Sequence, residues 1–170
     1  MPQTVDPQLI DYYRDAITAG AQFYGLGVVQ YAKPIGKMMT RTGAKTVLDY
    51  GCGMGHAYTR KKLHKRWGLN PPTLYDPAVL QFSAKPNGTF DGVICSDVLE
   101  HVGEELVDAV IAELFAYANK FVWASVCCRP AKKCFPDGRN MHVTIKNFAW
   151  WEEKMNRAAK GKLHLLSETP

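Results

Sequence analysis

The stretch Thr46-Val47-Leu48-Asp49-Tyr50-Gly51-Cys52-Gly53-Met54-Gly55 decides the fold of this chain. It begins as a short apolar run with β-branched residues and ends in three glycines at alternate positions, and residues 56–67 then have the composition of a helix closed by Gly68. Glycines at a strand-to-helix turn let the backbone turn sharply and approach a ligand, because no Cβ stands in the way. We therefore predict the first half of a strand–helix–strand unit that holds a ligand at the glycine loop.

Strands and helices alternate along the rest of the chain. Apolar or β-branched runs predict strands over residues 73–75, 91–96, 120–126 and 163–166. Apolar residues at helical spacing predict helices over residues 103–119 and 146–160. They also predict a helical segment over residues 6–41, which Gly20, Gly25 and Gly27 interrupt and which contains a second short helix from about residue 28 to 40. This alternation is typical of an α/β protein, so we predict a Rossmann-like parallel sheet flanked by helices.

The 170 residues fit a single domain, which we divide into an N-terminal helical segment (1–42) and a Rossmann-like core (43–170). No apolar run approaches the roughly 18 residues that a membrane span requires, so we expect no membrane role. Residues 1–9 lack the pattern of a secretory signal, and the five cysteines form no Cys-x-x-Cys pair. We expect a cytoplasmic protein with reduced thiols.

The glycine spacing also indicates the ligand. A dinucleotide fingerprint G-x-G-x-x-G would need glycine at position 56, which is His56, so a nicotinamide oxidoreductase is disfavoured. Asp49 before G-x-G-x-G resembles the first motif of the class I S-adenosylmethionine-dependent methyltransferases, and residues 90–101 resemble their fourth-strand motif. The resemblance covers residues 46–126. It implies S-adenosylmethionine as cofactor and contacts from Asp49, Tyr50, Gly51, Cys52, Gly53, Gly55, Asp76, Phe82, Ser96 and Asp97.

Asp76 follows the predicted strand at residues 73–75, where a carboxylate accepts two hydrogen bonds from a ribose diol. The alternative is that Asp76 is only a turn residue before Pro77. Residues 77–90 are too few for the helix and third strand that the family usually has there. We expect a small variant whose third strand is lost or reduced to an extended segment around residues 79–83, with Phe82 or a backbone group at adenine, and a short C-terminal end.

Asp97, Glu100 and His101 follow the fourth-strand motif, and His142 lies beyond the next strand. The methyl donor is already a strong electrophile, so catalysis needs alignment of the acceptor and removal of its proton. Either Glu100 or His101 acts as a base, or a divalent metal on Asp97, Glu100, His101 and His142 lowers the pKa of the acceptor. Oxygen and imidazole ligands suit Mg, Mn, Fe or Zn. The alternative is that Glu100 and His101 only cap the following helix.

Basic residues fill the loop after the strand at residues 120–126: Arg129, Lys132, Lys133 and Arg139. They predict either an anionic group on the acceptor or merely a soluble surface. The favoured function is methyl transfer to oxygen or nitrogen of a small molecule. RNA methylation is the enzyme alternative and gains if the basic run 60–66 and this loop form one face. A non-catalytic, cofactor-binding accessory protein is the third interpretation.

Overall fold

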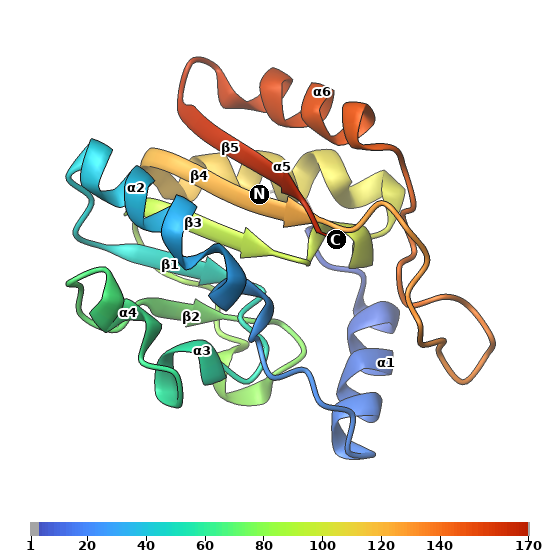
Figure 1. The fold of residues 1–170 in the computed structure, drawn as a ribbon. Coiled ribbons are helices and arrows are strands. Elements are labelled where there is room, and N and C mark those ends of the chain that lie inside the picture. Colours follow the sequence, from blue (N-terminus) through green and yellow to red (C-terminus); the bar gives the residue numbers. More distant parts are fainter. Residues whose placement is uncertain (1–3, 170) are drawn as a thin grey trace.

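The computed structural model describes residues 4–169. Within that range five strands form one parallel sheet in the order β2-β1-β3-β4-β5 (Figure 1). The strands are β1 (Val47–Tyr50), β2 (Thr73–Tyr75), β3 (Phe90–Ser96), β4 (Ala118–Val126) and β5 (Leu163–Glu168). The predicted Rossmann-like α/β fold is thus confirmed.

Helices cover both faces of the sheet, as parallel strands require. α5 (Glu104–Tyr117) and α6 (Phe148–Ala159) pack on one face. α2 (Ala32–Thr42) and the one-turn helices α3 (His56–Thr59) and α4 (Leu63–Arg66) pack on the other. The first helix, α1 (Pro7–Thr18), lies apart from both layers, at the carboxyl edge of the strands (Figure 1).

The central strands are buried on both sides. Val93 and Cys95 of β3 pack in the apolar cluster that contains α5 and α6, whereas Ile94 belongs to the cluster with α2. β4 shows the same alternation, with Val122 on the α5 side and Trp123 on the α2 side. All five side chains have no exposed area. This explains why these strands read as continuous apolar runs in the sequence.

Two predicted helices are divided. The helix expected over residues 6–41 is α1 followed, after a non-helical stretch, by the 3-10 turn η1 (Gly27–Tyr31) and α2, so the interruption falls at the predicted glycines. The helix expected over residues 56–67 is split into α3 and α4, because Lys62 adopts a left-handed conformation with φ of 52°. The prediction of one continuous helix there was wrong.

The connection from β2 to β3 contains no strand among the described residues. The 3-10 turn η2 (Leu80–Phe82) occupies it, and the Asp76 amide donates to Phe82 O at 3.0 Å. Of the two predicted alternatives, loss of the third strand is thus confirmed. The other alternative, an extended segment around residues 79–83, is replaced by a 3-10 turn. At the other end of the sheet, the segment after α6 forms one full strand, β5, parallel to β4.

No helix within residues 4–169 combines the length and apolarity needed to cross a bilayer. The expected single domain spans 1–170, of which residues 1–3 and 170 lie outside the described part.

The glycine loop is shaped by the chain that lies against it. Gly53 has φ of 54°, and a Cβ there would stand 2.5 Å from Phe23 O and 3.0 Å from the Gly25 amide nitrogen. The Met54 amide donates to Phe23 O at 2.9 Å, and the His56 amide donates to Tyr24 O at 3.0 Å. Glycine is therefore needed at position 53 for close approach of residues 23–25 as well as for backbone conformation.

Gly53→Ala should destabilise the protein more than Gly43→Ala. Both glycines have a left-handed conformation, which costs alanine about 1–2 kcal/mol. Only Gly53 meets backbone atoms, whereas a Cβ at Gly43 meets nothing within 4 Å. Crowding adds about 1–3 kcal/mol at Gly53. Urea unfolding of both variants measures the difference, and equal losses would contradict the close approach.

Candidate functional site

A cavity of about 440 Å³ opens at the carboxyl ends of β1, β2 and β3. In parallel α/β sheets this is the edge where ligands bind, and the volume is in the range of small-molecule sites. The glycine loop and residues 76–79 line one side, residues 96–98 and His101 line another, and α1 with residues 22–27 closes the cavity. Six of the predicted cofactor residues line it: Tyr50, Gly51, Gly53, Asp76, Ser96 and Asp97.

Asp76 is held in place by the backbone. Its Oδ2 accepts from the Gly53 amide at 2.8 Å, and its Oδ1 accepts from the Ala78 amide at 2.9 Å. Burial raises the pKa of this carboxyl, although the backbone hydrogen bonds oppose the change. A carboxylate offers about four acceptor sites, so two remain free for a diol. Asp76 can therefore stabilise the turn before Pro77 and still accept hydrogen bonds from a ribose diol.

Asp49 is the last residue but one of β1 and is 2% exposed. Burial raises its pKa to about 7, the nearby Tyr58 hydroxyl opposes that rise, and Asp76 adds repulsion. Asp76 thus lines the cavity, and Asp49, which is buried and does not line it, lies close enough to Asp76 for the two carboxyl groups to repel each other. A bound cation would favour their charged forms.

Four predicted cofactor residues do not line the cavity, namely Asp49, Cys52, Gly55 and Phe82, and the Tyr50 hydroxyl turns away from it. The Tyr50 hydroxyl donates to Glu113 Oε2 at 2.6 Å, although other atoms of Tyr50 line the cavity. The Cys52 thiol is buried and contacts Gly53 O. Phe82 is not among the lining residues, and its ring packs near Gly55. Phe82 was expected to line the cavity at adenine. Residues 77–79 line the cavity instead, because the short connection folds back as η2.

Ser96 and Asp97 end β3 beside the cavity. Asp97 has a left-handed backbone with φ of 55°, which is unusual for a residue other than glycine. Its Oδ1 accepts from the Ser125 hydroxyl at 2.8 Å and from the Thr169 hydroxyl. Ser96 Oγ lies 3.1 Å from Ser125 Oγ. The Asp97 carboxylate is thus fixed by hydroxyl groups at the mouth of the cavity.

Glu100, His101 and His142 come together, with one ligand atom from each residue within 4.8 Å of the others. Asp97, the fourth predicted ligand, lies outside this group, and its carboxylate accepts hydrogen bonds from Ser125 and Thr169. Glu100 and His101 belong to the 3-10 turn η3 (Leu99–His101), and His142 belongs to the loop after β4.

Each member of the cluster keeps one atom available. Glu100 is fully buried; its Oε1 accepts from the Cys127 amide at 2.9 Å, while Oε2 has no hydrogen-bond partner. His142 Nδ1 lies 2.6 Å from Arg129 O, and His101 Nδ1 lies 2.9 Å from Met141 O. Because Nδ1 of each ring faces a backbone carbonyl, both Nε2 atoms are left free.

Burial changes the ionisation of this cluster. It raises the pKa of Glu100 to about 8, and the neighbouring Asp97 contributes to the rise. Burial also lowers the pKa of His101 to about 4, with repulsion from His142 as the second cause. His101 is therefore neutral at pH 7. A proton on Nδ1 donated to Met141 O would leave Nε2 unprotonated.

A second cavity lies on the other side of His101. Arg129, Lys132, Lys133 and His142 line it, and His101 and Phe23 line both cavities. Two of the three predicted substrate residues, Arg129 and Lys132, are thus placed together. Arg139 is not among the lining residues, because its guanidinium pairs with Asp137 at 2.8 Å and lies over the Tyr12 ring.

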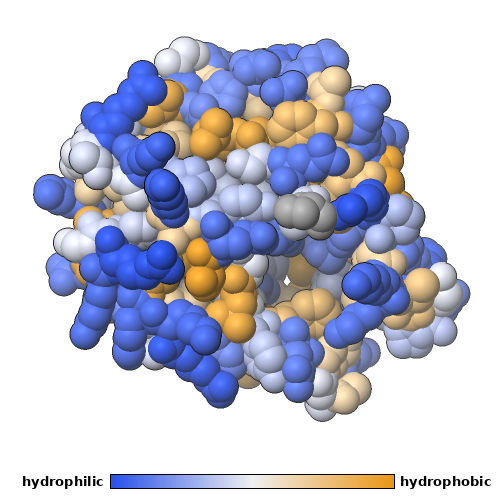
Figure 2. Space-filling model, viewed as in Figure 1, coloured by the Kyte–Doolittle hydropathy of each residue, from blue (hydrophilic) through white to orange (hydrophobic). Residues whose placement is uncertain are grey.

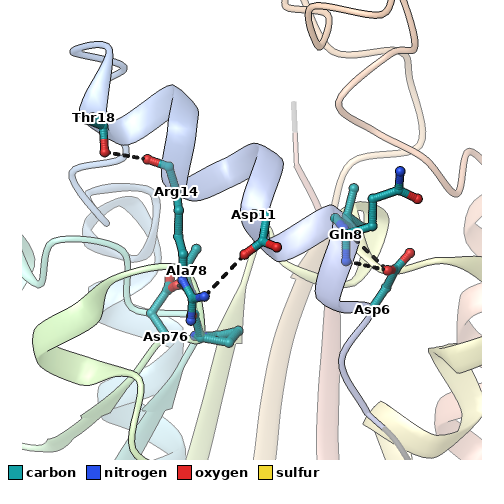
Figure 3. Close-up of polar contacts among 9 residues, drawn as sticks. Asp6, Gln8, Asp11, Arg14, Thr18, Asp76 and Ala78 are labelled. Atoms are coloured by element: carbon teal, nitrogen blue, oxygen red, sulfur yellow. Dashed lines mark hydrogen bonds and ion pairs between the residues drawn. The ribbon is translucent and has the colours of Figure 1, made fainter.

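Helix α1 connects the two sides of the first cavity. The Tyr13 hydroxyl lies 2.6 Å from His101 Nδ1 and donates to Met141 O at 2.9 Å. The next residue, Arg14, extends toward the loop of Asp76 and Ala78 (Figure 3) and donates to Pro77 O at 2.9 Å. The only sequence signal was the aromatic residues on α1, whose side chains cannot be placed without the fold.

Comparison with known proteins agrees with this geometry. A family model described as a methyltransferase domain matches residues 29–168, which include all five strands and exclude α1. A search of curated proteins found no significant match. The matched range covers most of the chain and contains the glycine loop, Asp76 and the fourth-strand motif. The chain therefore belongs to the class I S-adenosylmethionine-dependent methyltransferases.

Proposed function

We propose that this protein transfers the methyl group of S-adenosylmethionine to an oxygen or nitrogen atom of a small, anionic acceptor. One observation carries the proposal: His101 stands between a cavity that contains Asp76 and a second cavity lined by Arg129, Lys132 and Lys133. A cofactor on the acidic side and an acceptor on the basic side would meet at His101.

The acidic side suits the cofactor. The two free acceptor sites of Asp76 would hold the ribose hydroxyls, and the glycine loop would let the rest of the cofactor approach the backbone. The cofactor also carries positive charge on its sulfonium and amino groups. That charge would offset the cost of ionising Asp49 and Asp76, whose pKa values are raised by burial.

The basic side suits the acceptor. Arg129 and Lys132 are in the loop that follows β4, and Lys133 points over the Phe23 ring at 5.7 Å. Cationic side chains around a small cavity favour a carboxylate or phosphate. An acceptor held there by its anionic group would present its hydroxyl or amine toward His101.

His101 is placed to remove the acceptor proton. Its unprotonated Nε2 would accept that proton as the acceptor oxygen or nitrogen forms a bond to the methyl carbon and the carbon–sulfur bond breaks. Tyr13 and Met141 fix the ring through Nδ1. α1 covers one side of the cavity, which would limit the access of water and favour productive alignment over side reactions.

The cluster of Glu100, His101 and His142 also fits a divalent metal. The fit rests on the buried Glu100 Oε2, which has no partner, and on the two Nε2 atoms left free by the backbone carbonyls. This donor set of two imidazoles and one carboxylate suits Mn, Fe or Zn and is compatible with Mg. A metal held there would lower the pKa of the acceptor hydroxyl.

Charge selection at the acceptor cavity can be tested by enzyme assay. Methyl transfer from radiolabelled S-adenosylmethionine is measured for a set of hydroxy acids and amino acids, each beside its neutral carboxamide. We expect transfer to acids in preference to carboxamides. Lys132→Gln should raise the acceptor KM about tenfold, equivalent to about 1.4 kcal/mol, and leave the KM for S-adenosylmethionine unchanged.

Lys160→Gln is the matched control, since Lys160 is exposed beyond α6 and lines neither cavity. Equal transfer to carboxamides, or an equal effect of both substitutions, would contradict an anionic acceptor. Cofactor binding without transfer to any acceptor would instead favour the accessory-protein interpretation.

Metal binding can be tested by elemental analysis. After dialysis against Mn, Fe or Zn and removal of free ions, we expect about one bound ion per chain in the unmodified protein. Glu100→Gln and His142→Gln should each lose it, because a structural donor set needs all its ligands. His164→Gln, at an exposed histidine outside the cluster, should retain it. Absence of any ion from the unmodified protein would leave His101 as the base without a metal.

A further inference from the structure

Charge is distributed unevenly along the chain. Residues 16–75 contain nine of the 21 Lys and Arg residues but one of the 16 Asp and Glu residues, and that one is the buried Asp49. The remaining residues have a small excess of acidic side chains. The net charge of +5 therefore understates the charge of one region.

The nine basic side chains are exposed and unpaired. Four are Lys33, Lys37, Arg41 and Lys45, and five belong to the run 60–66; all are exposed. Within residues 4–169 none of them forms a salt bridge or a side-chain hydrogen bond, whereas seven of the other twelve Lys and Arg residues pair with a carboxylate. The pairing that neutralises basic residues elsewhere in the protein is missing here.

The nine residues form one surface, which we call the basic face. Lys33, Lys37 and Arg41 are four residues apart on α2 and so lie along one side of that helix. α2 contacts the α4 region directly, because Trp67 Nε1 donates to Ala32 O at 2.8 Å. Strongly hydrophilic residues gather over α2, α3 and α4 on the left of Figure 2.

The basic face is separate from the acceptor cavity. In Figure 1, α4 and the loop that follows β4 lie at opposite ends of the molecule. The run 60–66 and the loop with Arg129 and Arg139 therefore do not form the single face that would have favoured RNA as the acceptor. The partner of the basic face need not be the methylated molecule.

Repulsion among the unpaired cations costs free energy, which argues that the basic face binds an anionic partner. Like charges four residues apart destabilise a helix by a few tenths of a kcal/mol per pair, and an uncompensated field opposes the compact state. A membrane surface would require apolar side chains for insertion. The exposed large apolar residues Leu80, Ile145 and Leu165 all lie outside residues 16–75.

The breadth of the face indicates the partner. Nine cations spread over α2, α4 and the segments beside them match a polymer with regularly repeated negative charges better than one small anion. No exposed aromatic side chain lies among residues 16–75, so base stacking is not offered. We propose that the basic face binds the phosphodiester backbone of a nucleic acid without reading its sequence.

Fluorescence anisotropy tests the proposal with labelled 20-nucleotide probes: single-stranded RNA, duplex RNA and duplex DNA. Binding should weaken steeply with salt, because each phosphate contact releases counterions. The triple variant Arg41→Gln, Lys61→Gln and Lys65→Gln should bind about tenfold or more weakly at 100 mM salt. It should also reduce the slope of log K against log salt by about three.

The matched control removes the same charge elsewhere, with Lys146→Gln, Arg157→Gln and Lys160→Gln on and beside α6. It should retain the affinity and slope of the unmodified protein. The proposal is overturned if the control loses as much affinity as the triple variant, if the unmodified protein binds none of the probes at 20 mM salt, or if anionic phospholipid vesicles or polyglutamate bind as tightly as the probes.

Lysine acetylation of the unmodified protein gives a readout that does not depend on any variant. Saturating duplex or single-stranded probe should protect Lys33, Lys37, Lys61 and Lys65 at least several-fold, while Lys160 stays reactive. Uniform protection, or protection confined to Lys132 and Lys133, would overturn the assignment to the basic face.

Discussion

Two buried carboxyl groups, Asp49 and Asp76, stand at the carboxyl ends of β1 and β2, and the arrangement of the site follows from them. Desolvation raises both pKa values, so burial opposes their ionisation. Backbone amides of the glycine loop and of residue 78 hold Asp76 in place. A cofactor that carries positive charge would favour the ionised forms of both carboxyl groups. The positions of β1 and β2 would in this way determine which ligand charge the site prefers.

The N-terminal segment completes the site. Residues 23–25 lie on the glycine loop through two backbone hydrogen bonds, and α1 contacts both the Asp76 loop and His101. The family match begins at residue 29, so these contacts come from outside the matched range. The glycines of the loop therefore let two groups come close to its backbone: residues 23–25 of the protein and the proposed cofactor. A substitution there would affect stability and binding together.

Local sequence predicted where the strands lie along the chain, the glycine loop and the position of Asp76, because each depends on residue types within one short segment. It did not predict the break at Lys62, since a left-handed lysine has no distinct sequence signal. It grouped Asp97 with Glu100 and His101, but contacts with Ser125 and Thr169 from distant segments hold that carboxylate apart. The same limit applies to Arg139 and to Tyr13, whose partners are set by the tertiary fold.

Calorimetric titration in buffers of different ionisation enthalpy tests the central role of the two carboxyl groups most directly. At pH 7, where Asp49 is about half protonated, S-adenosylmethionine should bind with release of protons. The demethylated product, which lacks the sulfonium charge, should release fewer. Asp49→Asn should remove most of the difference between the two ligands. Failure of S-adenosylmethionine to bind, or identical proton release by both ligands, would contradict the account.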